Sequence, residues 1–385
     1  MTIGGLGRVQ TQRVVLFDED DPLVLSSGVR LAPVQVAYET YGSLDAERAN
    51  AVFVCHALSG DAHAAGHHGD PSRRGWWDTI IGPGRPLDTE RYFVVCPNLL
   101  GGCAGTTGPA TIDPRTGRAY GLRFPLLTVR DLVAVHRALL RHLDIGRLHG
   151  AIGGSLGGMQ VLQWALDQPQ EIERGVLVCA SARLNALNIA LTAVARAAIT
   201  SDPDFADGDY LDGPRRPDRG LSLARKLGHI TYLSSESMRR KFDRSRRGGP
   251  SAPMTISNDF EIEHYLDHQG ESFVERFDAL SYLYLTRLMD YFDPFADPDL
   301  ELARISTRLL AISFDSDWRF GSEHSRHLVE VLRAGGVDAR HVEVSSPWGH
   351  DSFLLEGDAY LRLVTQALSE PVGPRFAARR RRDVV

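Results

Sequence analysis

The chain has 385 residues, of which 43% are hydrophobic and 24% charged, and its formal net charge is -6 at pH 7. This composition excludes collagen-like, disordered and disulfide-scaffold proteins, and the acidic balance argues against a nucleic-acid partner. All but two of the 43 basic residues are arginines, so only Lys226 and Lys241 could support chemistry at a lysine amine.

The four cysteines, Cys55, Cys96, Cys103 and Cys179, lie mostly inside apolar runs and form no C-x-x-C pair. We therefore expect buried free thiols, no disulfide and no metal site. The N-terminal residues lack the apolar core of a signal peptide, and no stretch approaches the roughly 20 apolar residues of a membrane-spanning helix. These features predict a cytoplasmic protein without a membrane partner.

Strand-like runs alternate with helical patterns through the first half of the chain. Two early runs, 13–17 and 34–38, could form antiparallel strands at one edge of a sheet. Buried parallel strands are predicted at four later runs: 51–55, 92–96, 148–152 and 176–179. The apolar spacing over 128–143 and 159–166 predicts helices between them. This alternation is typical of a doubly wound α/β sheet.

The pattern changes over 184–300, where helical runs replace strand-like ones, and strands return at 308–314 and 340–344. The simplest interpretation is one α/β domain, formed by 1–183 and 301–385, with a helical insertion between the two parts. The alternative is two sequential domains, but the last part of the chain would then form a small and poorly closed sheet.

The most informative run is LHGAIGGSLGGMQVLQWAL, where a strand is followed by Gly153-Gly154-Ser155-Leu156-Gly157 and then by a helix. This is the G-x-S-x-G nucleophile elbow in the context that the motif requires. So sharp a turn needs glycine on both sides of the serine, and the helix N-terminus behind it offers N–H groups to an oxyanion. We predict that Ser155 is a nucleophile; the alternative is a glycine-rich turn with a bystander serine.

A serine nucleophile needs a base and an orienting acid, which follow later strands of an α/β-hydrolase sheet in the order Asp/Glu, then His. Asp315 and Asp317 follow the strand predicted at 308–314, and His350 follows the one at 340–344. We predict His350 as the base, while strand alternation leaves the two aspartates open as the acid.

The oxyanion hole is expected to combine the N–H of Leu156 with one from the loop CHALSG that follows the strand at 51–55. Leu58 is the predicted second donor. His56 is expected to shape this loop and to stay outside the triad.

With these residues placed, the sequence resembles the homoserine O-acyltransferases of methionine biosynthesis, which have the α/β-hydrolase fold. The resemblance covers nearly the whole chain and rests on motifs more specific than G-x-S-x-G. They are CHALSGDAHAAG (55–66), GWWDTIIGPGRPLDT (75–89), NLLGGCAGTTGPATIDP (98–114), GGSLGGMQVLQWA (153–165), SDPDF (201–205), LARKLGHITYLS (223–234), FEIEHYLDHQG (260–270) and GHDSFL (349–354). The CHAL segment favours homoserine over the serine-acylating branch of the family.

The resemblance implies that an acyl group passes from acyl-CoA, a co-substrate, through Ser155 to the γ-hydroxyl of L-homoserine, with no bound cofactor. It implies that Asp317, and not Asp315, is the acid and that His350 is the base. The insertion at 184–300 resembles the family's lid, which narrows the site to a tunnel and forms much of a homodimer interface.

The resemblance also implies substrate contacts for three charged residues. Arg225 and Asp351 match homoserine-binding positions, where they would hold the carboxylate and the ammonium group. Arg319, in DWRF, resembles members that use succinyl-CoA, whose terminal carboxylate a guanidinium can bind; acetyl users more often have an aliphatic residue there. The run GCAGTTGP at 102–109 also resembles acetyl users, so an acetyltransferase remains an alternative, as does an esterase or thioesterase with the same triad.

Overall fold

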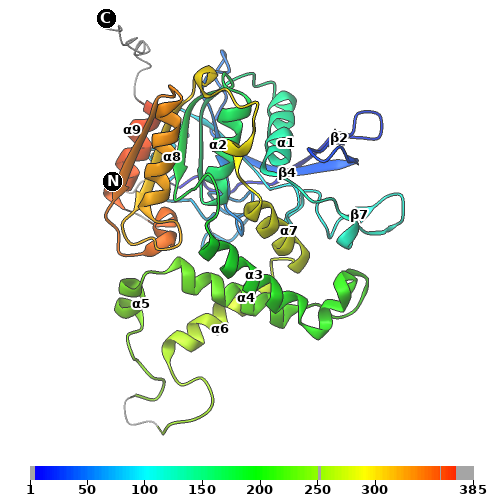
Figure 1. Ribbon diagram of the computed structural model, residues 1–385, viewed down its shortest axis with the longest axis vertical. Helices are drawn as coiled ribbons and strands as arrows, with labels where there is room; N and C mark the ends of the chain where they lie inside the picture. Colours follow the sequence, from blue (N-terminus) through cyan, green and yellow to red (C-terminus); the bar gives the residue numbers. More distant parts are fainter. Residues whose placement is uncertain (1–4, 250–252, 356, 370–385) are drawn as a thin grey trace, which may run out of the picture.

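A computed structural model of the protein describes residues 5–249, 253–355 and 357–369. Its centre is an eight-stranded sheet in the order β1-β4-β6-β5-β9-β10-β11-β12 (Figure 1). The strands are β1 (Gln12–Phe17), β4 (Val34–Tyr41), β5 (Ala51–Cys55), β6 (Phe93–Pro97), β9 (Leu148–Gly154), β10 (Ile172–Val178), β11 (Arg308–Phe314) and β12 (Ala339–Val344). The pairs β1–β4 and β4–β6 are antiparallel, and the other neighbours are parallel.

The remaining elements are helices and two small ribbons. The helices are α1 (Val129–His142), α2 (Leu156–Asp167), α3 (Ala186–Thr200), α4 (Asp218–Tyr232), α5 (Ser235–Lys241), α6 (Glu261–Val274), α7 (Ala279–Asp290), α8 (Ser322–Ala334) and α9 (Asp358–Ser369), with 3-10 turns η1 (Gly121–Arg123), η2 (Pro203–Gly208), η3 (Tyr210–Asp212), η4 (Pro294–Ala296), η5 (Leu302–Arg304) and η6 (Gly349–Leu354). The ribbons pair β2 (Leu23–Val24) with β3 (Arg30–Leu31) and β7 (Ile112–Asp113) with β8 (Arg118–Ala119). None of the helices in the described residues is both long and apolar enough to cross a membrane.

Most of the predicted strands are found close to their predicted positions, and the difference at the start of β10 has a local cause. The antiparallel pair at one edge is confirmed as β1 and β4, and the runs at 51–55 and 308–314 coincide with β5 and β11. Strand β10 starts four residues before the predicted run at 176–179, at Ile172. The first residues of β10 include the buried, ion-paired Arg174, a polar residue that interrupts the apolar pattern.

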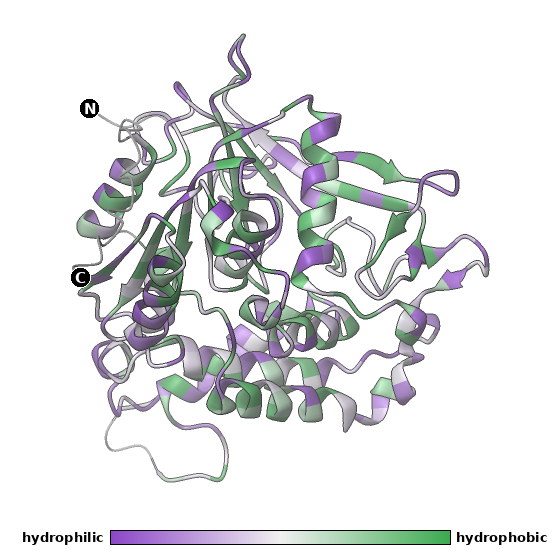
Figure 2. Cartoon of the chain, turned by 45° about the horizontal axis from the view of Figure 1, so that its top comes forward, coloured by the Kyte–Doolittle hydropathy of each residue, from purple (hydrophilic) through white to green (hydrophobic). Residues whose placement is uncertain are grey.

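Two hydrophobic clusters cover the two faces of the sheet because side chains alternate along each strand. In β5, Phe53 belongs to the cluster under α1, α2 and α8, whereas Val52 and Val54 belong to the cluster under α9. Figure 2 shows the strands as mostly hydrophobic, while the outer helices alternate hydrophobic and hydrophilic positions. This double coverage matches the parallel, fully buried strands expected for this fold class.

Between β10 and β11 the described chain forms helices α3 to α7 and no strand, and Figure 1 shows α3, α4 and α6 side by side next to the sheet. Helix α7 packs more deeply than the others. Its Leu280 and Leu285 join the core cluster beside α1, and the Tyr284 hydroxyl donates to the carbonyl of Phe124 at 2.6 Å. The insertion is therefore anchored on the sheet through its last helix.

Candidate active site

Four parallel strands direct the predicted site residues to one edge of the sheet. Strands β5, β9, β11 and β12, with β10 between β9 and β11, all run in the same direction, so their carboxyl ends meet at the same side. Leu58, Ser155, Asp317 and His350 follow these ends in that order. Open α/β sheets place their sites at this edge because the loops there are free to carry functional groups.

Ser155 lies in a strained turn between β9 and α2. Its backbone has φ 56° and ψ -121°, and its side chain is almost buried, with 7% of the residue exposed. A Cβ atom on Gly157 would lie 2.0 Å from the carbonyl oxygen of Cys55, and one on Gly153 would lie 2.4 Å from the carbonyl carbon of Gly157. Glycine is therefore required on both sides of the serine, as the G-x-S-x-G motif predicts.

The His350 ring is held by a buried carboxylate. Its Nδ1 lies 2.7 Å from Oδ2 of Asp317, while Oδ1 of Asp317 accepts the N–H groups of Arg319 at 3.0 Å and Phe320 at 2.8 Å. Burial opposes ionisation of Asp317, but His350 and the two amides outweigh it, so the pKa of Asp317 lies below its ordinary value. The Phe320 ring also stacks on His350 at 5.0 Å. With Nδ1 engaged as a donor, Nε2 is left to act as a base.

The structure brings His350 to Asp317 and not to Asp315. The exposed Asp315 carboxylate instead accepts the N–H of Ser346 at 3.0 Å. No hydrogen bond between the Ser155 hydroxyl and the His350 ring occurs in the described part of the chain. The Phe353 ring contacts both segments: its centre lies 5.7 Å from that of the His350 ring, and it would lie 2.5 Å from a Cβ atom on Gly154, the residue before Ser155.

The loop after β5 is held by a buried histidine. His56 places Nδ1 2.7 Å from the carbonyl of Ala57, and its Nε2 accepts the N–H of Leu99 at 3.1 Å. This pattern needs a neutral ring, and burial lowers the pKa of His56 accordingly. The N–H groups of Leu58 and Leu156 donate to no other described residue, so both remain free for an oxyanion.

Arg225 and Asp351, which are far apart in sequence, bring opposite charges to the same region. Arg225, in α4, donates to Oγ of Ser59 at 3.2 Å and lies over the Phe273 ring at 4.7 Å. Its buried Nε has no partner, and it makes no ion pair with a described carboxylate. Burial raises the pKa of Asp351, and His350 and Arg225 lie close enough to oppose this increase. Neither group forms a direct ion pair with another described side chain.

Arg319 is a nearly buried cation with 8% of the residue exposed. Its guanidinium donates to the Thr231 hydroxyl and lies 5.5 Å from the centre of the Tyr232 ring. Among the described residues it has no carboxylate within ion-pair distance. An arginine buried without an acidic partner is unusual, because desolvating a charge is costly unless another charge compensates it.

Sequence reasoning missed three neighbours of the site. The Tyr232 ring lies 5.9 Å from the His350 ring and also contacts the guanidinium groups of Arg225 and Arg319. Arg276 donates to the Ser59 carbonyl in the loop after β5 at 2.9 Å. The Cys179 sulfur lies within 4.8 Å of ligand atoms of Asp317 and His350. Its position at the end of β10 was the one available signal, whereas Tyr232 and Arg276 lie in helical patterns that showed none.

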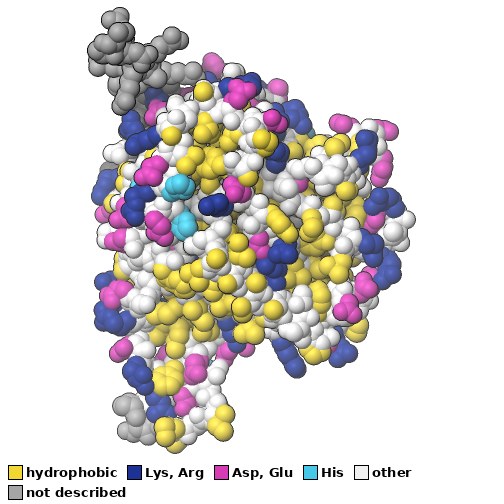
Figure 3. All heavy atoms as spheres, viewed as in Figure 1, with side chains coloured by type: hydrophobic (Ala, Val, Ile, Leu, Met, Phe, Trp, Pro, Cys, Tyr) yellow, Lys and Arg dark blue, Asp and Glu magenta, His cyan; other side chains and the backbone are white. Residues whose placement is uncertain are grey.

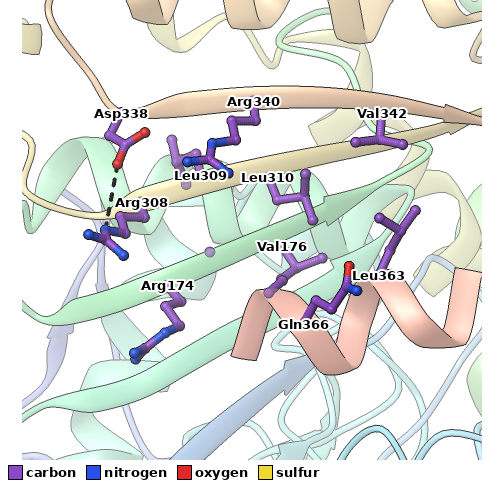
Figure 4. Close-up of a pocket in the computed structure, with 12 residues that line it drawn as sticks. Arg174, Val176, Arg308, Leu309, Leu310, Asp338, Arg340, Val342, Leu363 and Gln366 are labelled. Carbon is purple, nitrogen blue, oxygen red and sulfur yellow. Dashed lines mark ion pairs between the residues drawn. The ribbon is translucent and has the colours of Figure 1, made fainter. Parts of the chain in front are cut away.

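A pocket of about 180 Å³ lies at the opposite, amino-terminal edge of the sheet (Figure 4). Arg174, Arg308 and Arg340 line it, together with residues of α9. Figure 4 shows Arg308 paired with Asp338, and their closest atoms are 3.5 Å apart. None of the predicted site residues lines this pocket.

Comparisons with known proteins agree with this fold. Residues 50–357 match the family model described as alpha/beta hydrolase fold. A homoserine O-succinyltransferase of Nocardioides sp. is 57% identical over 367 residues, which cover 95% of this chain and 99% of that protein. A homoserine O-acetyltransferase of Methanosphaerula palustris is 48% identical over 91% of this chain and 72% of its own length.

Among solved structures, the homoserine O-acetyltransferase from Bacillus anthracis superposes with a TM-score of 0.85 and 29% identity, covering 95% of this chain and 99% of that one. The sheet, the elbow and the full-length similarity lead to one conclusion: the chain belongs to the homoserine O-acyltransferase family of α/β-hydrolase-fold proteins.

Proposed function

We propose that the protein transfers a succinyl group from succinyl-CoA to the γ-hydroxyl of L-homoserine, a step of methionine biosynthesis in the cytoplasm. The observation that carries the choice of donor is Arg319, a nearly buried guanidinium without an acidic partner among the described residues. The terminal carboxylate of a succinyl group supplies the missing charge, and an acetyl group has none to offer. The similarity to the Nocardioides homoserine O-succinyltransferase supports the same choice.

The proposed reaction has two halves that share one triad. His350, oriented by Asp317, takes the proton of Ser155 as the serine oxygen attacks the thioester carbonyl. The amides of Leu58 and Leu156 stabilise the oxyanion, CoA leaves as the thiol after receiving the proton from His350, and an acyl-serine remains. The γ-hydroxyl of homoserine then gives its proton to His350 as it attacks the acyl-serine carbonyl. The bond between the acyl carbon and the serine oxygen breaks, His350 returns the proton to Ser155, and the O-acyl product leaves.

Transfer in place of hydrolysis requires that homoserine outcompetes water for the acyl-serine. Arg225 would hold the acceptor carboxylate and Asp351 its ammonium group, which supports an oriented hydroxyl next to Ser155. Helices α3 to α6 would act as the lid that keeps water out. This role is supported by the contacts of the α4 end with the catalytic loops, since the Trp318 indole donates to the Leu233 carbonyl at 3.1 Å and Ser234 donates to the Pro347 carbonyl.

The same lid offers a surface for a second copy of the chain. Helices α3 and α4 expose several large apolar side chains, namely Leu187, Ile189, Val194, Leu223 and Ile230. Figure 3 shows hydrophobic side chains gathered over this helical part of the molecule. Because so contiguous an apolar surface marks an interaction site, we propose that the enzyme is a homodimer joined through these helices.

The second candidate donor is acetyl-CoA, which the 48% identity to the Methanosphaerula palustris homoserine O-acetyltransferase favours. A comparison of kcat/KM for the two acyl-CoA donors, each with and without L-homoserine, separates the possibilities. We expect CoA release that depends on homoserine and is faster with succinyl-CoA. Release independent of homoserine would indicate a thioesterase, and a preference for acetyl-CoA would contradict the succinyl assignment.

Replacement of Arg319 by leucine is expected to lower kcat/KM for succinyl-CoA by about 10- to 100-fold, the value of a charge-assisted hydrogen bond. The rate with acetyl-CoA should change much less, because the acetyl group has no carboxylate that could pair with the guanidinium of Arg319. Arg326→Leu is the matched control, since Arg326 is an exposed arginine of α8 that pairs with Glu343 of β12. An equal loss with both donors would show that Arg319 supports the neighbouring Asp317 loop and does not read the acyl group.

Replacement of Asp351 by asparagine is expected to raise the KM for homoserine by about 10- to 100-fold while changing kcat less. Because burial raises the pKa of Asp351, its carboxylate protonates at a higher pH than an ordinary aspartate as the solution is acidified. Acceptor affinity of the wild type should therefore fall toward acidic pH, and the variant should lose this dependence. Asp358→Asn, an exposed change in α9, is the control. A KM that stays at the wild-type value would remove Asp351 from the acceptor site.

A further inference from the structure

A second cluster of ionisable side chains lies outside the candidate active site, on the antiparallel side of the sheet. Glu39, in β4, is completely buried, with 0% of the residue exposed. His63 and His68 come from the loop that follows β5 and both direct a ring nitrogen to this carboxylate. The proposed reaction uses none of the three residues, and burying a carboxylate beside two imidazoles requires an explanation of its own.

The distances within the cluster suit a metal ion. Oε1 of Glu39 lies 2.7 Å from Nε2 of His68, and Oε2 lies 3.1 Å from Nδ1 of His63. All of these ligand atoms lie within 4.8 Å of one another. Zinc binds such atoms at about 2.0–2.2 Å, so two ligands of a tetrahedral ion are about 3.3 Å apart. One small ion can therefore contact all three side chains after minor shifts of the rings.

The charges of the cluster also favour a cation. The centres of the His63 and His68 rings are only 3.9 Å apart, so two imidazolium ions in this place would repel each other. One imidazolium is enough to balance the single carboxylate, so in the absence of an ion the second ring faces Glu39 as a neutral N–H donor. A divalent cation explains both contacts, because it binds two neutral imidazoles and the carboxylate at once.

The surroundings hold the ligands in place. The Glu39 carboxylate also accepts the hydroxyl groups of Thr11 at 2.8 Å and Tyr41 at 2.9 Å, and the backbone of Arg73 lies close to the His63 ring. Metal-binding histidines commonly donate their second N–H to a backbone carbonyl, which fixes the ring orientation. The His68 side chain is 48% exposed, which leaves solvent access to the cluster and room for a water ligand.

We propose that Glu39, His63 and His68 form a binding site for one divalent transition-metal ion of the zinc type, completed by water. Two imidazoles and one carboxylate suit zinc, whereas calcium and magnesium prefer oxygen ligands throughout. The ion is structural: it joins β4 to the loop that starts at the oxyanion segment, a short distance after Leu58. The site is therefore independent of the acyl-transfer assignment.

The test is a calorimetric titration of tag-free, chelator-treated full-length protein with Zn²⁺, repeated with Co²⁺ as a spectroscopic probe. We expect one ion per chain, a higher midpoint of thermal unfolding, and visible Co²⁺ absorption bands typical of nitrogen and oxygen ligands. Wild-type protein that shows no saturable binding would overturn the proposal.

Two neighbouring histidines supply the matched variants. His68→Ala removes a half-exposed ligand and should weaken binding at least tenfold without unfolding the protein. His67→Ala should bind as the wild type does, because the His67 side chain accepts the backbone N–H of Gly69 and lies outside the cluster, while its backbone contacts with Gly7 and Val9 are kept in the variant. Unchanged affinity in His68→Ala would place the ion elsewhere, for example at Cys179, Asp317 and His350, and would contradict the proposal.

Discussion

Replacement of Ser155 by alanine is expected to abolish acyl transfer while leaving the fold intact. The Ser155 hydroxyl is the proposed point of covalent attachment, so its loss removes the acyl-enzyme route altogether. By comparison with other serine enzymes, kcat should fall on the order of 10⁴- to 10⁶-fold, leaving only the contribution of the oxyanion donors and substrate binding. The measurement is homoserine-dependent CoA release from succinyl-CoA.

Two further measurements separate loss of the nucleophile from loss of structure. The thermal midpoint of Ser155→Ala should stay near the wild-type value, because serine and alanine both carry a Cβ atom and the positive φ at this position therefore strains them alike. A serine-directed phosphonate should label the wild type and Ser181→Ala, which changes another buried serine at the same edge, but not Ser155→Ala. Transfer at the wild-type rate in Ser155→Ala would rule out the covalent mechanism.

Replacement of Asp317 by asparagine is expected to lower kcat by about 10⁴-fold, the second-largest effect. One carboxylate oxygen accepts a hydrogen bond from the Nδ1–H group of His350 at 2.7 Å, and the other accepts two backbone N–H groups. An asparagine that keeps those two N–H contacts must turn its NH₂ group toward Nδ1. This favours the tautomer with the proton on Nε2, where the histidine can no longer accept the proton of Ser155.

Asp315→Asn is the matched control for this variant, since Asp315 lies two residues away in the same loop but is exposed and contacts the Ser346 amide. Its kcat should remain within a few-fold of the wild type. If the two substitutions had equal effects, the contact between Asp317 and His350 would not be the origin of the loss. If Asp315→Asn alone were inactive, the assignment of the acid would be reversed.

Local sequence was enough to predict the strands and the elbow because their signals come from neighbouring residues. Apolar runs marked β5 and β11, and the glycines around Ser155 revealed a turn that tolerates no Cβ atom beside β5. The position of His350 after the last strand followed from the order of elements alone. By contrast, the start of β10 was hidden by Arg174, whose burial depends on an ion pair and not on its own hydropathy.

The choice between Asp315 and Asp317 shows what the residues alone left open. Both follow β11, and alternation along a strand says nothing about side chains in the loop beyond its end. The resemblance favoured Asp317, and the tertiary structure supplies the physical reason, since only this carboxylate turns inward to His350. The missing partner of Arg319 is likewise visible only once its burial is known.

By itself, then, the sequence determined the α/β architecture, the strained serine and the order of the candidate triad, because each rests on short-range patterns of glycine, apolar spacing and strand ends. Only the tertiary structure decided which side chains from distant parts of the chain meet. It joined Tyr232 of the helical insertion to His350, and Glu39 of β4 to His63 and His68. Such pairings depend on the packing of elements that are remote in the chain, which no local pattern records.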